Sequence, residues 1–133
     1  MTATKEILVV EADEVTQNAL KLLLMQYKFK VNEACSIKES LEKYDIDSFD
    51  AIVSDLNLPD GLGTDLIKIT NTPVLIMTRY SSIRSAIDTI KMGAADYIAK
   101  PFDNNEIIDA VTRLISEKEN KKGSLTKNKD QEP

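Results

Sequence analysis

Residues 51–63 read AIVSDLNLPDGLG. The run Ala51–Ser54 is apolar apart from its last residue and contains β-branched side chains, which is typical of a strand covered on both faces. Proline and glycine residues then mark a loop. Asp55 stands where the strand gives way to this loop, and polar residues stand at similar places elsewhere in the chain. The carboxylate is therefore a candidate site residue.

Short apolar runs alternate with amphipathic stretches along the rest of the chain. Strands are expected at residues 7–10, 29–34, 51–54, 74–77 and 97–99. Helices are expected at residues 13–27, 36–44, 64–69, 82–92 and 103–115. This alternation predicts an α/β fold, with five parallel strands in a doubly wound sheet and five helices on its faces.

The helices have recognisable ends and apolar faces. Asp13 is expected to cap the first helix, and Ser36 and Glu39 form a capping-box pattern at the second. The predicted apolar period of the first helix is Val15, Ala19, Leu22, Leu23 and Gln26. The helix at residues 82–92 carries Ile83, Ala86, Ile87 and Ile90 on one face.

Composition limits what such a domain can do. The 133 residues form one domain with a single core, expected at residues 1–117, followed by a charged tail or linker at 118–133. A net charge of −5 argues against direct contact with nucleic acid. No stretch is long and apolar enough to cross a membrane, and no signal peptide is visible.

Histidine is absent from the sequence, which excludes histidine-based catalysis and histidine metal sites. Cys35 is the single cysteine, so an internal disulfide and a thiolate metal cluster are excluded as well. We expect Cys35 to be a small core residue. A cytoplasmic location follows as the default expectation.

Polar side chains follow four of the predicted strands. Because the carboxyl ends of parallel strands meet at one edge of a sheet, these side chains are expected to converge. A carboxylate there can act as the nucleophile that accepts a phosphoryl group. Phosphoryl transfer otherwise needs positioning and positive charge. The residues are Glu11 and Asp13, Asp55, Thr78 and Arg79, and Lys100.

Four segments of the chain resemble the receiver domains of two-component response regulators. They are Ile7–Glu11, Val53–Gly61, Ile76–Thr78 and Asp96–Phe102. The resemblance covers roughly residues 5–117, and it implies the flavodoxin-like strand order 2-1-3-4-5. It also implies a signalling function, in which a sensor histidine kinase or phosphotransfer protein supplies the phosphoryl group.

The resemblance implies a role for each matching residue. Asp55 corresponds to the phosphoacceptor, Lys100 to the lysine that pairs with it, and Thr78 to the switch hydroxyl. Tyr97 corresponds to the aromatic residue whose rotamer reports phosphorylation. Such a chain is a phosphoacceptor rather than an enzyme, and at most catalyses its own phosphorylation and dephosphorylation.

The resemblance implies Mg²⁺ as cofactor, held by Glu11, Asp55 and the backbone carbonyl of Asn57. Receivers normally carry two adjacent acids after the first strand, whereas this chain has Glu11 followed by Ala12. Asp13 lies one residue further along, and a one-residue shift changes the direction of a side chain, so it is a doubtful replacement. We therefore expect weakened dependence on Mg²⁺.

A second departure is Arg79, a large cation where receivers usually have a small residue beside the switch hydroxyl. It either narrows access for phosphate or supplies part of the positive charge that a metal would bring. With Lys100 it would balance the charges of Glu11 and Asp55, which leaves a nearly neutral pocket.

Three functions remain open from the sequence. The first is a phosphoacceptor domain that resembles the receiver of a transcriptional regulator. Such a domain would switch an output or target protein and could form a homodimer. Its output face would join helix 82–92, strand 97–99 and the last helix, and would include Ile83, Ile87, Lys91, Tyr97 and Lys118. The second is a degenerate receiver that acts as a protein-interaction module. The third, a nucleotide-binding domain, is disfavoured because no glycine-rich phosphate loop follows the first strand.

Overall fold

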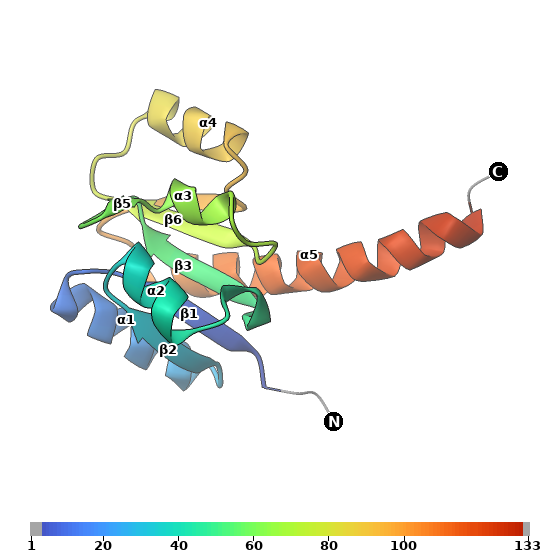
Figure 1. Cartoon of the computed structure of the whole chain (residues 1–133), viewed down its shortest axis with the longest axis horizontal. Coiled ribbons are helices and arrows are strands. Elements are labelled where there is room, and N and C mark those ends of the chain that lie inside the picture. Colours follow the sequence, from blue (N-terminus) through green and yellow to red (C-terminus); the bar gives the residue numbers. More distant parts are fainter. Residues whose placement is uncertain (1–3, 132–133) are drawn as a thin grey trace.

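The computed structural model describes the backbone of residues 4–131 and the side chains of residues 4–119. Its main sheet has five parallel strands in the order β2-β1-β3-β6-β7 (Figure 1). Counted along the chain within this sheet, that is the predicted order 2-1-3-4-5. The strands are β1 (Glu6–Val10), β2 (Lys30–Ala34), β3 (Ala51–Asp55), β6 (Val74–Thr78) and β7 (Asp96–Ala99).

Helices cover both faces of the sheet, as the alternating pattern predicts (Figure 1). They are α1 (Glu14–Gln26), α2 (Ile37–Lys43), α3 (Thr64–Ile67), α4 (Ile83–Lys91) and α5 (Asn104–Gln131). Three elements were not predicted because each is very short. They are a 3-10 helix (Ile46–Ser48) and the antiparallel pair β4 (Asn57–Leu58) and β5 (Gly61–Leu62), which lies in the loop after Asp55.

The core has two layers, one on each face of the sheet. Successive side chains of a strand point to opposite faces, so β1 contributes Ile7 and Val9 to one layer and Leu8 and Val10 to the other. The first layer packs against α1 and α5, and the second packs against α2 and α3. Strands β1 and β3 are buried along almost their whole length. Their loops therefore leave the sheet at fixed positions.

The apolar face predicted for α1 is wrong except at Leu23, which is buried as predicted. The structure buries Leu20, Leu23 and Leu24, whereas Val15 and Leu22 are exposed. Three consecutive leucines at residues 22–24 allow more than one helical phase, and the sequence alone does not decide which of them packs on the sheet. The predicted helix itself and its cap at Asp13 are confirmed.

Helix α5 is longer than predicted, since it continues past residue 115 to Gln131 and extends beyond the sheet (Figure 1). Lysine and glutamate are good helix formers, so the loss of apolar periodicity ends the packing on the core without ending the helix. A tail or linker at 118–133 stays a prediction, and residues 132–133 lie outside the described backbone. Within residues 4–131, no helix is both long and apolar enough to span a bilayer.

The second helix begins with a variant of the expected capping box. Ser36 Oγ accepts a hydrogen bond from Glu39 N at 3.0 Å, and Glu39 Oε1 accepts one from Cys35 N at 2.7 Å. Cys35 is exposed, so its predicted place in the core is wrong. Its thiol also donates to Glu39, and this hydrogen bond raises the pKa of Cys35 above its ordinary value.

A more distant carboxylate also caps α2. Asp60, in the turn between β4 and β5, accepts hydrogen bonds from Ile37 N at 3.0 Å and Lys38 N at 2.9 Å. These two N–H groups are among those that a helix leaves without an internal partner. They hold the pKa of Asp60 below its ordinary value, Lys38 having the larger effect. The loop that follows Asp55 is thereby fastened to α2.

Acidification is expected to destabilise the fold, because an ionised carboxylate accepts these hydrogen bonds more strongly than the protonated acid does. The Thr16 hydroxyl and N–H lower the pKa of Asp13 in the same way, and the Thr70 hydroxyl and the Asn71 N–H lower that of Asp47. Since each folded-state pKa lies below the ordinary value of 3.8, the unfolded chain binds more protons as the pH falls through this range. The unfolding temperature, measured by circular dichroism, should therefore fall as the pH drops below about 4.

Asp60→Asn tests whether the capping carboxylate of Asp60 contributes to this loss of stability in acid. An asparagine has one acceptor oxygen for the two N–H groups, so the variant should melt at a lower temperature at neutral pH and change less on acidification. Asp88→Asn is the control, since Asp88 is an exposed aspartate on α4. Equal pH dependence in Asp60→Asn and the unmodified protein would contradict the prediction.

Candidate functional site

Four strand ends meet at one edge of the sheet. The register pairs Val10 of β1 with Ser54 of β3, and Asp55 with Met77 of β6. Thr78 in turn pairs with Ala99 of β7. The residues that end or directly follow these strands are therefore neighbours across the edge, although almost 90 positions separate the first from the last. They are Glu11, Asp55, Thr78 and Lys100.

Lys100 connects the two acidic side chains of this edge. Its Nζ lies 2.5 Å from Glu11 Oε1 and 3.4 Å from Asp55 Oδ2. Glu11 is 2% exposed, Lys100 9% and Asp55 17%. Burial strengthens these attractions, and it also makes any unpaired charge at this edge costly. Asp55, the most exposed of the three, keeps access to solvent and to a reactant.

The remaining acids near β1 are already engaged. Glu11 Oε2 accepts a hydrogen bond from Asp13 N at 3.2 Å. Asp13 caps α1, because its carboxylate accepts from both the hydroxyl and the N–H of Thr16. These bonds lower the pKa of Asp13, with smaller contributions from the charges of Lys100 and Arg79. These bonds hold the Asp13 carboxylate at the start of α1. The side chain of Ala12 has no oxygen that could bind a metal ion.

Thr78 and Tyr97 lie on the neighbouring strands β6 and β7, and β6 pairs with the strand that ends at Asp55. Thr78 is fully buried, and its Oγ1 accepts a hydrogen bond from Tyr80 N at 3.1 Å. Tyr97 is half-buried, and its hydroxyl lies 3.2 Å from Ser85 Oγ on α4. The Tyr97 side chain therefore connects β7 to α4.

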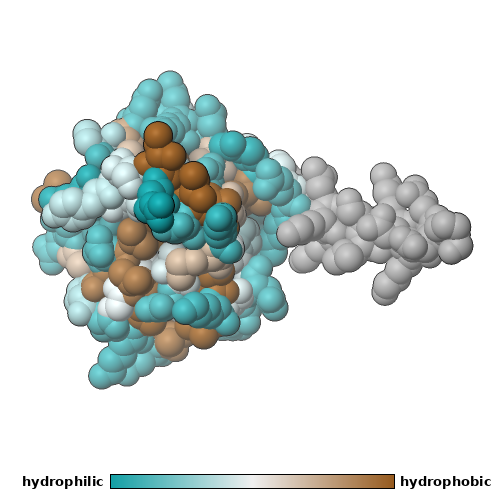
Figure 2. Space-filling model, turned by 90° about the horizontal axis from the view of Figure 1, so that it is seen from above, coloured by the Kyte–Doolittle hydropathy of each residue, from teal (hydrophilic) through white to brown (hydrophobic). Residues whose placement is uncertain are grey.

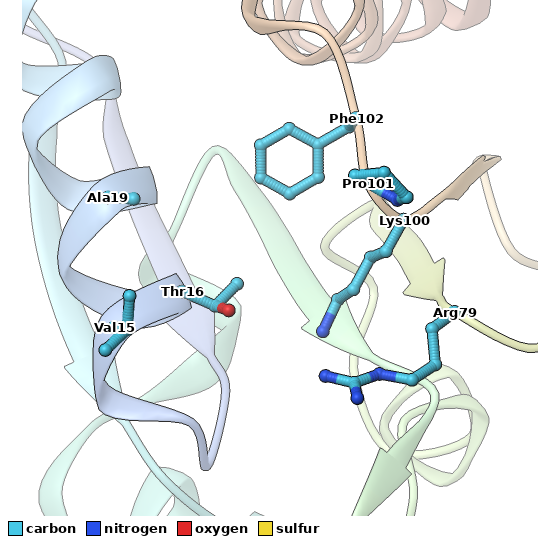
Figure 3. Close-up of a pocket in the computed structure, with 7 residues that line it drawn as sticks. All are labelled: Val15, Thr16, Ala19, Arg79, Lys100, Pro101 and Phe102. Carbon is cyan, nitrogen blue, oxygen red and sulfur yellow. The ribbon is translucent and has the colours of Figure 1, made fainter.

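A pocket of about 480 Å³ opens next to Lys100, between the start of α1 and the segment that follows β7. In Figure 3 the side chains of Lys100 and Arg79 extend in the same direction, toward the end of α1 that carries Val15 and Thr16. Phe102 and Pro101 also line this pocket. Two cationic side chains thus share one wall of a pocket at the carboxyl edge of the sheet.

Two residues of the loop after Asp55 shape the site although the sequence did not single them out. Asp60 fastens the loop to α2. Gly63 packs so closely on the end of β3 that a Cβ there would lie 2.3 Å from the carbonyl oxygen of Asp55. Neither contact has a local sequence signal, because each joins segments that meet only in the folded chain.

Oxygen donors for a cation are few at this edge. Glu11 is engaged by Lys100 and Asp13 N, while Asp13 is engaged by Thr16. The carboxylate of Asp55 is less tightly engaged, with Lys100 at 3.4 Å, and Asn57 follows it at the start of β4. In the part of the chain that the structure describes, no three acidic or cysteine side chains come together in a way that could hold a metal ion.

The apolar face of α4 points away from the core. Ile83 is 82% exposed, and Ile87 and Ile90 are about half exposed, whereas Thr89 is the residue that α4 buries. Figure 2, viewed from the side on which α4 lies, shows apolar side chains among polar ones on this surface. Lys118, expected on the same face, instead donates a hydrogen bond to Phe49 O at 3.1 Å. It thus binds the segment that leads into β3.

Comparison with known proteins gives a consistent result. The response regulator receiver domain family matches residues 7–112. The cell cycle transcriptional regulator CtrA of Caulobacter vibrioides (strain NA1000 / CB15N) is 30% identical over 129 residues, which cover 93% of this chain and 56% of CtrA. The transcriptional regulatory protein ZraR of Escherichia coli (strain K12) is 39% identical over 116 residues, or 84% of this chain and 26% of ZraR.

The fold has close structural counterparts as well. The non-phosphorylated HemR receiver domain from Leptospira biflexa matches with a TM-score of 0.75 and 35% sequence identity. The match covers 85% of this chain and 95% of that one. The chain thus spans nearly all of a solved receiver domain, but about half of CtrA and about a quarter of ZraR.

Proposed function

Because the chain belongs to the response regulator receiver domain family, we propose that Asp55 is its phosphoacceptor. Phosphorylation and the switching of an output are general properties of this family, whose members interact with histidine kinases and output domains. They are signalling domains rather than classical enzymes. The observation that carries the proposal is the position of Asp55, a partly exposed carboxylate at a strand end, 3.4 Å from the ammonium of Lys100.

The proposed reaction is a transfer of one phosphoryl group from a phosphohistidine of a sensor kinase or phosphotransfer protein. A carboxylate oxygen of Asp55 attacks the phosphorus atom, and a new O–P bond forms as the N–P bond breaks. The electron pair of that bond leaves with the donor imidazole. Lys100 neutralises negative charge at the acceptor. Thr78 is the proposed hydrogen-bond donor to a phosphoryl oxygen, since its own oxygen already accepts from Tyr80 N.

The signal would leave the site through α4, β7 and α5. Thr78 moves toward the phosphoryl group, and Tyr97, whose hydroxyl contacts Ser85 of α4, changes its position with it. This is a shift between two packings of one fold. The exposed apolar face of α4 then contacts an output domain, a target protein or a second copy of the chain.

CtrA and ZraR are named transcriptional regulators. We extend this to the present chain as part of the proposal, in which the receiver controls a transcriptional output and acts in the cytoplasm. The chain itself makes no direct contact with DNA in this proposal, consistent with its net charge of −5.

Intact-protein mass spectrometry tests the phosphoacceptor assignment. After incubation with acetyl phosphate and Mg²⁺, the unmodified chain should gain the mass of one phosphoryl group, and Asp55→Asn should gain none. Asp65→Asn is the matched control, since Asp65 is a nearby aspartate on α3, and it should be phosphorylated like the unmodified chain. Phosphorylation of Asp55→Asn at the unmodified rate would overturn the assignment.

A degenerate receiver is the second candidate function, and Ala12 is the observation that favours it. In that case the chain binds its partner through the α4 face without phosphorylation. The same mass experiment would then show no adduct on the unmodified chain. Partner binding, measured by calorimetry, would be unchanged in Asp55→Asn.

A further inference from the structure

Receiver domains generally bind Mg²⁺ for phosphorylation, and the donor set of this chain does not fit that ion. Mg²⁺ requires oxygen ligands in near-octahedral geometry. Ala12 supplies no side-chain oxygen, and both carboxylate oxygens of Glu11 already have hydrogen-bond partners, Lys100 and Asp13 N. The carboxylate of Asp13 is bound to Thr16 at the start of α1. Asp55 is therefore the least engaged of these carboxylates, since its contact is the 3.4 Å ion pair with Lys100.

The same edge carries an additional positive charge. Arg79 follows Thr78 directly and lines the same pocket wall as Lys100 (Figure 3). Among the side chains that the structure describes, Arg79 forms no ion pair, whereas Lys100 is paired with Glu11 and Asp55. Both cations are close enough to Asp13 for their charges to lower its pKa. The guanidinium is thus available to an anion that arrives at Asp55.

The geometry points to a phosphoacceptor site that works without a divalent cation, in which Lys100 and Arg79 supply the positive charge around the phosphoryl group. This inference rests on the function proposed above. Lys100 contacts Oδ2 of Asp55, while Arg79 reaches the phosphoryl oxygens from the pocket that it lines with Lys100. The charges of Lys100 and Arg79 then offset those of Glu11 and Asp55. Because Arg79 has no ion-pair partner among the described side chains, it can bind the incoming phosphoryl oxygens.

Arginine suits this role better than a second lysine would. Its planar guanidinium offers parallel N–H donors that match two oxygens of one phosphoryl group, and it stays charged at any pH at which the protein is folded. In the transfer step the O–P bond to Asp55 forms and the bond to the leaving group breaks. The leaving group departs with the electron pair, so no metal, oxidant or further reactant is required.

The test compares rates of phosphoryl gain on the full chain, by intact mass, with acetyl phosphate in EDTA and in Mg²⁺. We expect the unmodified chain to be phosphorylated at similar rates in both. Arg79→Gln should slow the reaction in EDTA about tenfold, the effect of losing about 1.4 kcal/mol of charge-assisted hydrogen bonding in the transition state. Arg84→Gln is the matched control, since it removes an exposed arginine from α4, and its rate should not change.

Ala12→Asp provides a readout that does not depend on phosphorylation. Residue 12 is exposed, so an aspartate can be accommodated there. Calorimetric titration with Mg²⁺ should show weak or no binding to the unmodified chain and clear binding to Ala12→Asp. Tight binding of Mg²⁺ to the unmodified chain would overturn the inference.

The outcomes separate this inference from the proposed function. Phosphorylation in Mg²⁺ but not in EDTA would overturn the metal-independent site and leave Asp55 as phosphoacceptor. No phosphorylation in either condition would overturn the proposed function, and this inference with it. Equal rates for Arg79→Gln and Arg84→Gln in EDTA would exclude Arg79 from the site.

Discussion

Replacing Lys100 with methionine is expected to lower the free energy of unfolding by about 3–5 kcal/mol, the usual cost of leaving a buried charge without its partner. The ammonium of Lys100 lies 2.5 Å from Glu11 Oε1 and 3.4 Å from Asp55 Oδ2. Methionine keeps the length of the side chain and removes its charge. Glu11 then remains 2% exposed with no cation in contact, and it also repels Asp55. Urea unfolding at neutral pH, followed by circular dichroism, measures the loss.

Lys21→Met is the matched control for this prediction. Lys21 pairs with Glu33 at 3.0 Å, but about a third of each side chain is exposed, so its removal should cost less than about 1 kcal/mol. Adding Glu11→Gln to Lys100→Met removes one of the two stranded charges and should restore part of the stability. If Lys100→Met were no less stable than Lys21→Met, burial would not be what makes this ion pair strong.

The sheet could be predicted from the sequence because its strands are buried on both faces. Such strands read as continuous apolar runs, as in Ile7–Val10 and Val74–Met77. Parallel connections then fix which strand ends share an edge, so Asp55 and Lys100 could be placed together although 45 positions separate them along the chain. The resemblance to receiver domains supplied the strand order, which the structure confirms.

The direction in which a helix turns its faces could not be predicted in the same way. In α1 the run Leu22–Leu24 is compatible with more than one apolar face, and tertiary packing selects Leu20, Leu23 and Leu24. In α4 the isoleucines share one face, and this face points outward while Thr89 is buried. The resemblance to receiver domains, and not the periodicity, placed Ile83 and Ile87 on an exposed face. Periodicity identifies an apolar face without saying whether the core or a partner covers it.

The ion pairs within the site could not be predicted from the sequence either. The sequence showed that Ala12 lacks a carboxylate, but it did not show that Lys100 engages Glu11 more closely than Asp55. The cap formed by Asp13 was predicted, but the sequence did not show that the Thr16 hydroxyl also binds the Asp13 carboxylate. These contacts depend on side-chain directions at the ends of three different segments. Residue 12 therefore lacks a carboxylate, and the carboxylates of Glu11 and Asp13 are already bound to other groups of the protein.

Gly63→Ala is expected to lower the free energy of unfolding by about 1–3 kcal/mol, the usual cost of forcing atoms into a packed region. An added Cβ would lie 2.3 Å from the carbonyl oxygen of Asp55 and 2.7 Å from Ser54 Oγ. The backbone of Gly63 has φ −56°, which alanine adopts readily, so the cost comes from the contact and not from the backbone conformation. Gly63 N also donates to Leu56 O at 2.7 Å, and this bond prevents the loop from moving away without loss.

Ser54→Ala separates the two close contacts of this glycine. The hydroxyl of Ser54 can be removed, whereas the carbonyl oxygen of Asp55 belongs to the backbone and remains in every variant. The double variant Gly63→Ala with Ser54→Ala should therefore stay nearly as unstable as Gly63→Ala in urea unfolding. Full recovery in the double variant would show that the serine hydroxyl, and not the end of β3, requires glycine. Because the clash falls on Asp55, the proposed phosphoacceptor, Gly63→Ala should also slow phosphoryl gain in the mass experiment.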